Sequence, residues 1–284
     1  MSEFLEAVGS YAFMRNALLT GLLASVACGV VGSFVVVRRI SYIAGGIAHC
    51  VLGGIGAALY LERVHGWDAL DPLHGALAAA LLAAVVIGLV SLRAKQRVDT
   101  VIGAVWAIGM ASGVLFLSQT PGYGEDLMSY LFGNILMVTG SDLWLLAALD
   151  VVVVAAAILF FKQLQSVCFD EEFSKVRGLN VDAYFVFLLV LTALTVVLLV
   201  TVVGIVMVIA LLTIPSAVAG HFTNRLSHMM VAAIGISIVL TSAGLAASYG
   251  PDLPAGATII VLAGVTYLLV AAGSVLLRRR APQR

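Results

Sequence analysis

Long apolar segments recur along the whole chain and decide what it can fold into. Each is about 20 residues long, the length of helix that crosses a hydrocarbon core of about 30 Å. We therefore predict an all-α, polytopic membrane bundle of eight to nine transmembrane helices. The count has a range because the sixth and seventh segments adjoin. The segments are residues 13–37, 43–61, 73–92, 100–118, 141–161, 181–202, 203–222, 229–248 and 256–277.

The low charge of the chain excludes a soluble protein. Only 11% of the 284 residues are charged and 62% are hydrophobic, whereas a soluble domain carries roughly 25% charged residues. Strands of a membrane barrel would alternate in polarity over about 10 residues, which these segments do not do. The sequence shows no stretch of soluble composition, so we expect residues 1–284 to form a single transmembrane domain.

Basic residues indicate how the bundle is oriented. Cytoplasmic loops of membrane proteins are enriched in Lys and Arg. Most of the 15 such residues fall on one side of the nine-segment arrangement, with only Arg15 and Arg63 on the other. This predicts an external N-terminus and a cytoplasmic C-terminus. The residues on the predicted cytoplasmic side are Arg38, Arg39, Arg93, Lys95, Arg97, Lys162, Lys175, Arg177, Arg225, Arg278, Arg279, Arg280 and Arg284; those on the acidic, external side are Glu62, Asp68, Asp71, Glu125, Asp126, Asp142 and Asp252.

Two loops are longer than a turn. Residues 119–140 are predicted to lie outside, and they contain an amphipathic piece, 126–138, that is too short to span and is expected at the membrane interface. Residues 162–180 are predicted to be cytoplasmic. Acids at 170–172, a basic pair at Lys175 and Arg177, and the helix-stopping Gly178 match the charge preferences of helix ends. We expect a short helix near 169–179, which is either a docking element or a solvated connector.

One histidine lies inside a glycine-rich apolar segment, residues 40–56. In a helix, Gly45, His49 and Gly53 share one face, and Gly46 lies on the adjacent stripe with Cys50 and Gly54. Glycine is costly in a helix unless backbones approach closely. A histidine facing lipid would also be costly, so His49 should face the bundle interior or a wet pathway. It is either a metal ligand or a packing residue that bonds a neighbouring helix.

Asp150 is the other ionisable residue at depth, within residues 141–161. Such a carboxyl needs a partner or a pathway. We favour a structural role, with metal binding as the alternative. Pro215 interrupts the segment 203–222, and we expect Thr213 and Ser216 to satisfy the carbonyl group that it frees. It is either a simple kink or a hinge beside a translocation path.

Missing motifs limit the chemistry of the chain. None of its three lysines (Lys95, Lys162 and Lys175) follows glycine, so the phosphate-binding loop GxxxxGK[ST] is absent and the chain is not itself an ATPase of that class. HExxH and GxSxG are absent too, so we expect no enzyme. Cys28, Cys50 and Cys168 show no CxxC spacing, and no permanently bound cofactor is expected.

Three segments in the same order resemble the permeases of zinc and manganese ATP-binding-cassette transporters. FVVVRRISYIAGGIAHCVLGGIGAALYL is similar to the family's second-helix region, VVGIVMVIALLTIPSAVAG to a later proline-containing helix, and FDEEFSKVRGLNV to its coupling helix. His49 matches the family's intramembrane histidine. The sequence departs from the pattern at Gly45, where many members have aspartate, and at Ser174, where alanine is common.

The resemblance implies the membrane-spanning permease subunit of an ATP-driven importer for divalent metal ions (zinc, manganese or iron) in the bacterial plasma membrane. It further implies a second permease subunit, forming a homodimer, two cytoplasmic ATPase subunits and an extracytoplasmic metal-binding protein. His49 would line the ion path, with Gly45, Gly46, Gly53 and Asp150 as further candidates. Contact with the ATPase would involve Asp170, Glu171, Phe173 and Gly178, and Pro215 would be the hinge.

Two other functions remain open on the sequence. A secondary transporter driven by an ion gradient would need no ATPase, but it usually has inverted repeats and several buried charges. The sequence shows no clear repeat, and only His49 and Asp150 are ionisable at depth. A permease for iron chelates or cobalamin would share the architecture but would need a wider path.

Overall fold

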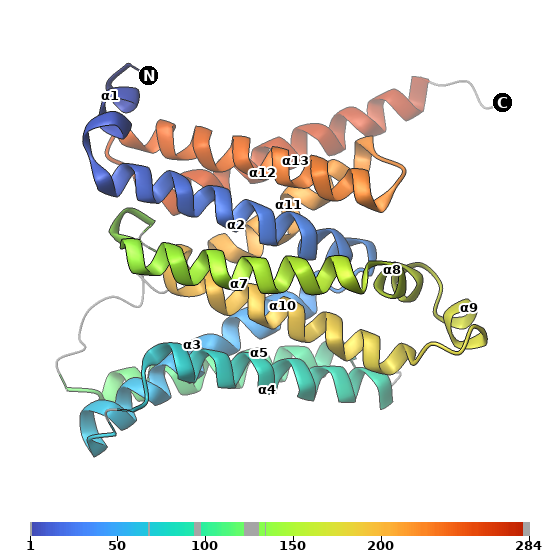
Figure 1. The fold of residues 1–284 in the computed structure, drawn as a ribbon, viewed down its shortest axis with the longest axis horizontal. Helices are drawn as coiled ribbons and strands as arrows, with labels where there is room; N and C mark the ends of the chain where they lie inside the picture. Colours follow the sequence, from blue (N-terminus) through green and yellow to red (C-terminus); the bar gives the residue numbers. More distant parts are fainter. Residues whose placement is uncertain (1, 68, 94–97, 122–130, 134, 281–284) are drawn as a thin grey trace.

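Long helices lie side by side and run roughly along the horizontal axis of Figure 1. The computed structural model describes residues 2–67, 69–93, 98–121, 131–133 and 135–280. Within them the elements are α1 (Ser2–Ser10), α2 (Ala12–Val37), α3 (Ser41–His65), α4 (Pro72–Arg93), α5 (Val98–Gln119), η1 (Ile135–Met137), α7 (Gly140–Leu159), α8 (Phe161–Phe169), α9 (Glu171–Val176), α10 (Val181–Val203), α11 (Ile205–Phe222), α12 (Leu226–Tyr249) and α13 (Ala255–Arg280).

The predicted all-α membrane bundle is confirmed, and the helix count settles at the upper end of the predicted range. Nine helices of the described chain are long and apolar enough to cross a membrane. The sixth and seventh are separate because Gly204 adopts φ 81° between α10 and α11. A positive φ is readily available only to glycine, so the chain breaks the helix there and starts the next one at Ile205.

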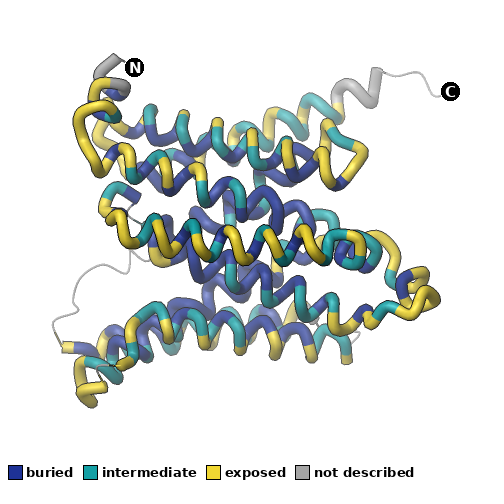
Figure 2. The backbone as a smooth tube through the Cα atoms, viewed as in Figure 1, coloured by how far each residue is buried: buried dark blue, intermediate teal, exposed yellow. Residues whose placement is uncertain are grey.

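The helices form three layers (Figure 1). The first contains α2, α11, α12 and α13, and the third contains α3, α4 and α5; α7 and α10 lie between them. Most residues of α2 and α3 are buried, whereas only a minority of the residues of α5, α7 and α13 are (Figure 2). In a membrane, such exposed apolar faces meet lipid or another subunit.

The two ends of the bundle differ in charge as the sequence predicts. Helix α13 ends at the same end of the bundle as α8 and α9, and α1 begins at the opposite end (Figure 1). The turns after α2 and α11 share the end of α8 and α9, so the basic residues Arg38, Arg39, Lys162 and Arg225 all belong to this end of the bundle. The side of the membrane on which this end lies stays a prediction. Of the charged residues used for it, Asp68, Lys95, Arg97, Glu125, Asp126 and Arg284 lie outside the described residues.

The predicted amphipathic piece is described only in part, since residues 126–130 and 134 lie outside the described chain. The remainder includes the short 3₁₀ helix η1 and a close backbone crossing. Gly133, with φ 69°, packs directly against Val203 and Gly204 at the break between α10 and α11. Asn16 of α2 donates a hydrogen bond to the Val138 carbonyl oxygen at 3.0 Å. The segment is therefore attached to the bundle at both points.

Candidate functional site

The His49 side chain lies at the middle of α3 and is buried, with 8% of its surface exposed. Its ring stacks on the indole of Trp106 from α5, with the ring centroids 4.2 Å apart and the planes at 11°. The Nδ1 atom is buried and has no hydrogen-bond partner among the described residues. A buried nitrogen without a partner costs about 1–3 kcal/mol, so the packing of this ring leaves a polar atom unsatisfied.

The predicted Gly45, His49 and Gly53 face packs against α5. A Cβ added to Gly45 would lie 4.0 Å from the Trp106 ring, and one added to Gly53 would lie 2.7 Å from the Gly109 carbonyl oxygen. Gly46 on the adjacent stripe faces Ile102 of the same helix. Small residues allow this close backbone approach in a membrane. The density of glycine in α3 is thus explained by packing at the α3–α5 contact.

On its other side α3 packs closely against α4. Gly54 and Gly75 face each other so closely that a Cβ on either would overlap the other's carbonyl group. A pocket of about 270 Å³ opens between α3, α4 and α5, and its walls are mostly apolar. Cys50 contributes to this wall and donates a weak hydrogen bond from Sγ to the Val105 carbonyl oxygen at 3.3 Å. Cys50 lines this pocket, whereas its neighbour in sequence, His49, does not, because the His49 ring is covered by Trp106.

The donor atoms around His49 are sparse within one chain. Among the described residues, no three His, Cys, Asp or Glu side chains are grouped so that they would hold a metal ion. An imidazole nitrogen is a good ligand for zinc and other first-row transition metals. A lone imidazole without further protein ligands can thus make only a weak contact with a metal ion.

Asp150 occupies a different part of the bundle. Its carboxyl is buried on α7, and its Oδ2 atom has no hydrogen-bond partner among the described residues. Helix α7 packs on α2 and α10, and Asp150 lies near Cys28 of α2. The ring of His49 instead faces α5, in the layer on the other side of α10 (Figure 1). The structure does not bring Asp150 and His49 together.

Pro215 is buried within α11, which continues through it. A proline frees the carbonyl group four residues earlier, here that of Leu211. The expected compensation by Thr213 and Ser216 is not observed, since the Thr213 hydroxyl donates to the Ile209 carbonyl at 2.7 Å and Ser216 Oγ has no partner. Gly32 of α2 packs against the Leu212 carbonyl instead. This close contact between α2 and α11 leaves no room for a side chain at position 32.

The predicted short helix near 169–179 is present as α9, and both of its ends are capped. Asp170 Oδ1 accepts a hydrogen bond from the Phe173 N–H at 2.9 Å. At the other end Gly178 has φ 78°, and the Gly178 and Leu179 N–H groups donate to the Lys175 and Ser174 carbonyls. These are the contacts of a glycine-terminated helix end.

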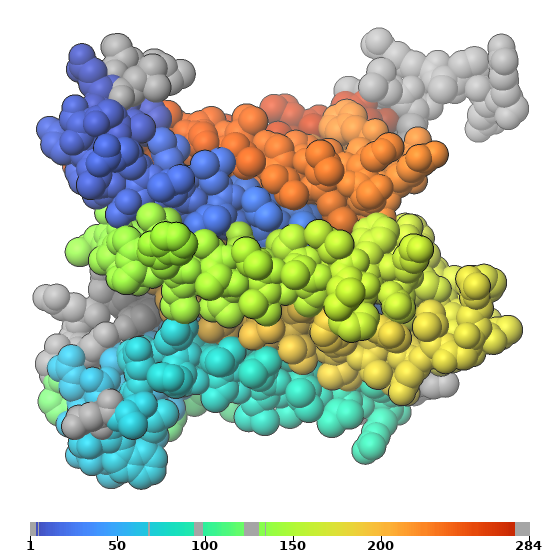
Figure 3. Space-filling model, in the orientation of Figure 1, coloured from blue at the N-terminus to red at the C-terminus, as the bar shows by residue number. Residues whose placement is uncertain are grey.

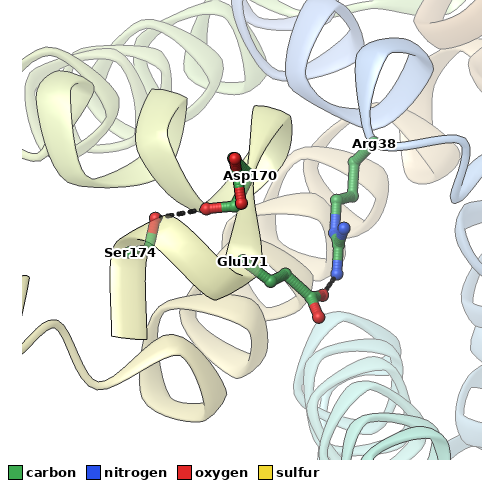
Figure 4. A network of polar contacts seen from close by, with 4 residues as sticks. All are labelled: Arg38, Asp170, Glu171 and Ser174. Atoms are coloured by element: carbon green, nitrogen blue, oxygen red, sulfur yellow. Dashed lines mark hydrogen bonds and ion pairs between the residues drawn. The ribbon is translucent and has the colours of Figure 1, made fainter. Parts of the chain in front are cut away.

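Two side-chain contacts attach α9 to the bundle. Ser174 is fully buried, donates to the Asp170 carbonyl oxygen at 2.7 Å and accepts from Ser166 of α8 at 2.6 Å. Glu171 forms an ion pair with Arg38, which follows α2 (Figure 4). The departure from alanine at position 174 is therefore accommodated by a hydroxyl pair.

The outer side of α9 presents apolar side chains at the end of the bundle. Phe173 is 53% exposed and Val176 is 86% exposed, and Phe169 at the end of α8 is exposed as well. The Arg177 guanidinium lies 5.6 Å from the centre of the Phe173 ring. In the space-filling view α8 and α9 form part of the protruding end of the molecule (Figure 3). Exposed aromatic and aliphatic groups around an arginine are typical of a protein-binding surface.

Two residues of this arrangement did not emerge from the sequence as functional candidates. Trp106 is an aromatic residue in an apolar segment, and nothing in its spacing pairs it with His49. Arg38 served only to predict orientation. The sequence did offer two signals, a basic residue (Arg38) before a glycine-rich helix and an acidic residue (Glu171) at the start of a capped helix. That the two residues pair depends on the tertiary fold.

The comparisons with known proteins agree with one another. The profile of the ABC 3 transport family matches residues 10–274. An uncharacterized membrane protein of Synechocystis is 42% identical over 95% of this chain and 93% of its own length. The manganese transport system membrane protein MntC of Listeria monocytogenes is 32% identical over 94% of this chain and 92% of its own length. The solved structure of PsaBC from Streptococcus pneumoniae superimposes with a TM-score of 0.83 at 30% identity, covering 95% of this chain and 94% of that one.

Proposed function

Because this chain belongs to the ABC 3 transport family, it is the membrane-spanning permease subunit of a metal transporter, and we propose that it passes a divalent transition-metal ion along the face of α3 that carries His49. The observation that carries this proposal is the buried imidazole whose Nδ1 atom has no partner. An unpaired polar atom at the middle of a membrane span costs free energy, and such groups are usually retained for a function such as ligand binding. The family gives no support to a gradient-driven transporter.

Trp106 closes the path in the conformation described here, and we propose that a second copy of the chain completes it. The ring of Trp106 covers His49, and few residues of α5, which carries Trp106, are buried within the chain. A homodimer that buried this face would place two imidazoles near one seam. Sparse ligation of this kind suits transport, because four protein ligands would hold zinc too tightly for release.

Manganese and zinc are the two candidate ions, for different reasons. The Listeria relative is named as a manganese transport protein. Zinc accepts nitrogen ligands readily, whereas manganese prefers oxygen ligands. The family's usual aspartate is replaced by Gly45, which faces the Trp106 ring. The chemistry around His49 thus favours zinc, and the relative favours manganese.

Energy would come from a separate ATP-hydrolysing subunit that docks on α9. Helix α9 is capped at its two ends by Asp170 and Gly178, and Phe173 on this helix is exposed at the end of the bundle. Glu171 is directed inward to Arg38. We place this end in the cytoplasm. An extracytoplasmic metal-binding protein would deliver the ion to the opposite, acidic end, where negative charge raises the local cation concentration.

The proposal is tested by reconstituting the permease with the ATPase and binding protein encoded beside it. Vesicles are supplied with ATP, and uptake of manganese, zinc and iron(II) is measured separately. We expect ATP-dependent accumulation of manganese or zinc, and no accumulation when the phosphate-loop lysine of the ATPase is replaced by alanine. Uptake that follows an imposed ion gradient without ATP would refute the proposal.

A further inference from the structure

An ion pair joins helix α9 to the turn between α2 and α3, the helix that carries His49. Glu171 is the first residue of α9, and its carboxylate pairs with the guanidinium of Arg38 (Figure 4). The side chains are 23% and 39% exposed for Arg38 and Glu171 respectively. The pair is therefore partly withdrawn from water. Salt screens such a pair less than it screens a fully exposed one.

Arg38 is held by more than its partner. Its guanidinium carbon lies 5.6 Å from the centre of the Phe185 ring on α10. Its Nε atom is buried and has no hydrogen-bond partner among the described residues. Removing Glu171 would leave a partly buried charge without its counter-ion, which is costly. The position of the Arg38 head group is thus coupled to α9 and α10 together.

The backbone at Arg38 leads directly into α3. Arg38 caps α2, and the next residue, Arg39, has φ 61°, a left-handed conformation that is uncommon outside glycine. The Arg39 and Ile40 N–H groups bond the Val36 and Val35 carbonyls. Helix α3 begins at Ser41, and His49 lies roughly 12 Å further along it at 1.5 Å per residue. Between Arg38 and His49 the chain therefore consists of this hydrogen-bonded turn and continuous helix.

We propose that Arg38 is a positioning residue for transport: its pair with Glu171 transmits displacement of α9 to the α2–α3 turn and so to the His49 face of α3. This inference rests on the proposed function. It differs from a merely structural fastening of α9 in what it predicts. A fastening would set how much transporter assembles, whereas a transmitting pair sets how many ions cross for each ATP hydrolysed.

The test uses the complete transporter, reconstituted with its ATPase and binding protein. Three variants are compared with the wild type: Arg38→Glu, Glu171→Arg and the double exchange of both. Arg39→Glu is the matched control, since it makes the same charge change at an exposed neighbour. ATP hydrolysis and ion uptake are measured on the same vesicles and divided by the amount of assembled complex.

We expect each single reversal to lower the ions transported per ATP by about tenfold, and the double exchange to restore most of the ratio, because two contacting charges are coupled. Arg39→Glu should keep the wild-type ratio. Single variants that assemble less but keep that ratio would overturn the proposal, and so would a double exchange no better than the singles.

If the reversals prevent assembly, Glu171→Gln replaces them. It removes the charge but keeps the shape, and we expect a lowered ratio at normal assembly; an unchanged ratio would again overturn the proposal. Metal uptake by the wild-type vesicles distinguishes a failure of this proposal from a failure of the proposed function. If they show no ATP-driven metal uptake at all, the proposed function fails whatever Arg38 does.

Discussion

At the scale of single residues, the proposed ion path depends on the stacked pair of His49 and Trp106. The stacked arrangement buries both faces of the contact and leaves Nδ1 of His49 without a partner. Trp106 is itself fixed, because its Nε1 lies 3.2 Å from the Met110 sulfur and its ring lies near Tyr42. Stacking of aromatic rings contributes about 0.5–1.5 kcal/mol beyond burial. That is small enough for the energy of a transport cycle to separate the rings.

Trp106→Ala should make His49 accessible, because no other described ring stacks on it. We expect carbethoxylation of His49 by diethylpyrocarbonate to rise several-fold in the purified protein, measured by peptide mass spectrometry. Trp106→Phe keeps a stacking ring and serves as the matched control. Equal modification of His49 in the alanine variant and the wild type would mean that Trp106 is not what closes the site.

At the scale of helices, backbone crossings at glycine hold α3 between α4 and α5. The closest of them is the reciprocal contact of Gly54 with Gly75. At such a crossing a single methyl group forces the backbones apart, which typically costs about 1–3 kcal/mol in a packed core. The position of the His49 side chain depends on these contacts, since they fix the rotation of α3 and its shift along its own axis.

Gly54→Ala should therefore destabilise the protein by about 1–3 kcal/mol, while Gly264→Ala should not. Gly264 is also in a membrane-spanning helix, but a Cβ there would meet nothing within 4 Å. The check is the apparent unfolding temperature of both variants in the same detergent. If the two variants unfold at the same temperature, close packing does not explain the glycine residues of α3.

Helix α9 offers a second prediction at this scale. Asp170→Ala removes the cap from α9 and should cost about 1 kcal/mol of local stability, whereas Asp170→Asn keeps a good capping group and should cost much less. We expect co-purification of the ATPase to fall in the alanine variant only. A loss of similar size in both variants would show instead that the charge of Asp170 contacts the ATPase.

Most of the helices could be predicted because their signals are local. Apolar length predicted all nine spans, and Gly178 correctly marked the end of α9. The break between α10 and α11 was harder, since the apolar composition runs through it and only the φ of Gly204 separates the helices. The helix α1 was not predicted, because nine residues of mixed polarity carry little periodic signal.

The candidate site could be predicted only in part. The placement of Gly45, His49 and Gly53 on one face follows from helical spacing, and they do meet one neighbour. That the neighbour is α5, with Trp106 over the imidazole, depends on tertiary packing between segments far apart in the sequence. The same is true of Arg38 and Glu171. The roles of Asp150 and Pro215 stay predictions.

At the scale of the whole molecule, the nine spans of the described chain place the start of α2 and the end of α13 at opposite ends of the bundle. Because basic residues gather at the end of α8 and α9, we predict that this end is cytoplasmic. Alkaline phosphatase, which is active only outside the cytoplasm, should be inactive when fused after Arg284 and active when inserted at Asp252, between α12 and α13. The reverse pattern would invert the orientation.

The central claim is that a divalent metal ion crosses the membrane past His49, driven by a separate ATPase. The most direct test is ATP-dependent metal uptake by the reconstituted transporter with His49→Ala, compared with His221→Ala, which changes an exposed histidine at the end of α11. With equal amounts of assembled complex, we predict uptake at least about tenfold lower for His49→Ala and close to wild type for His221→Ala. Wild-type uptake by the His49→Ala transporter would contradict the account.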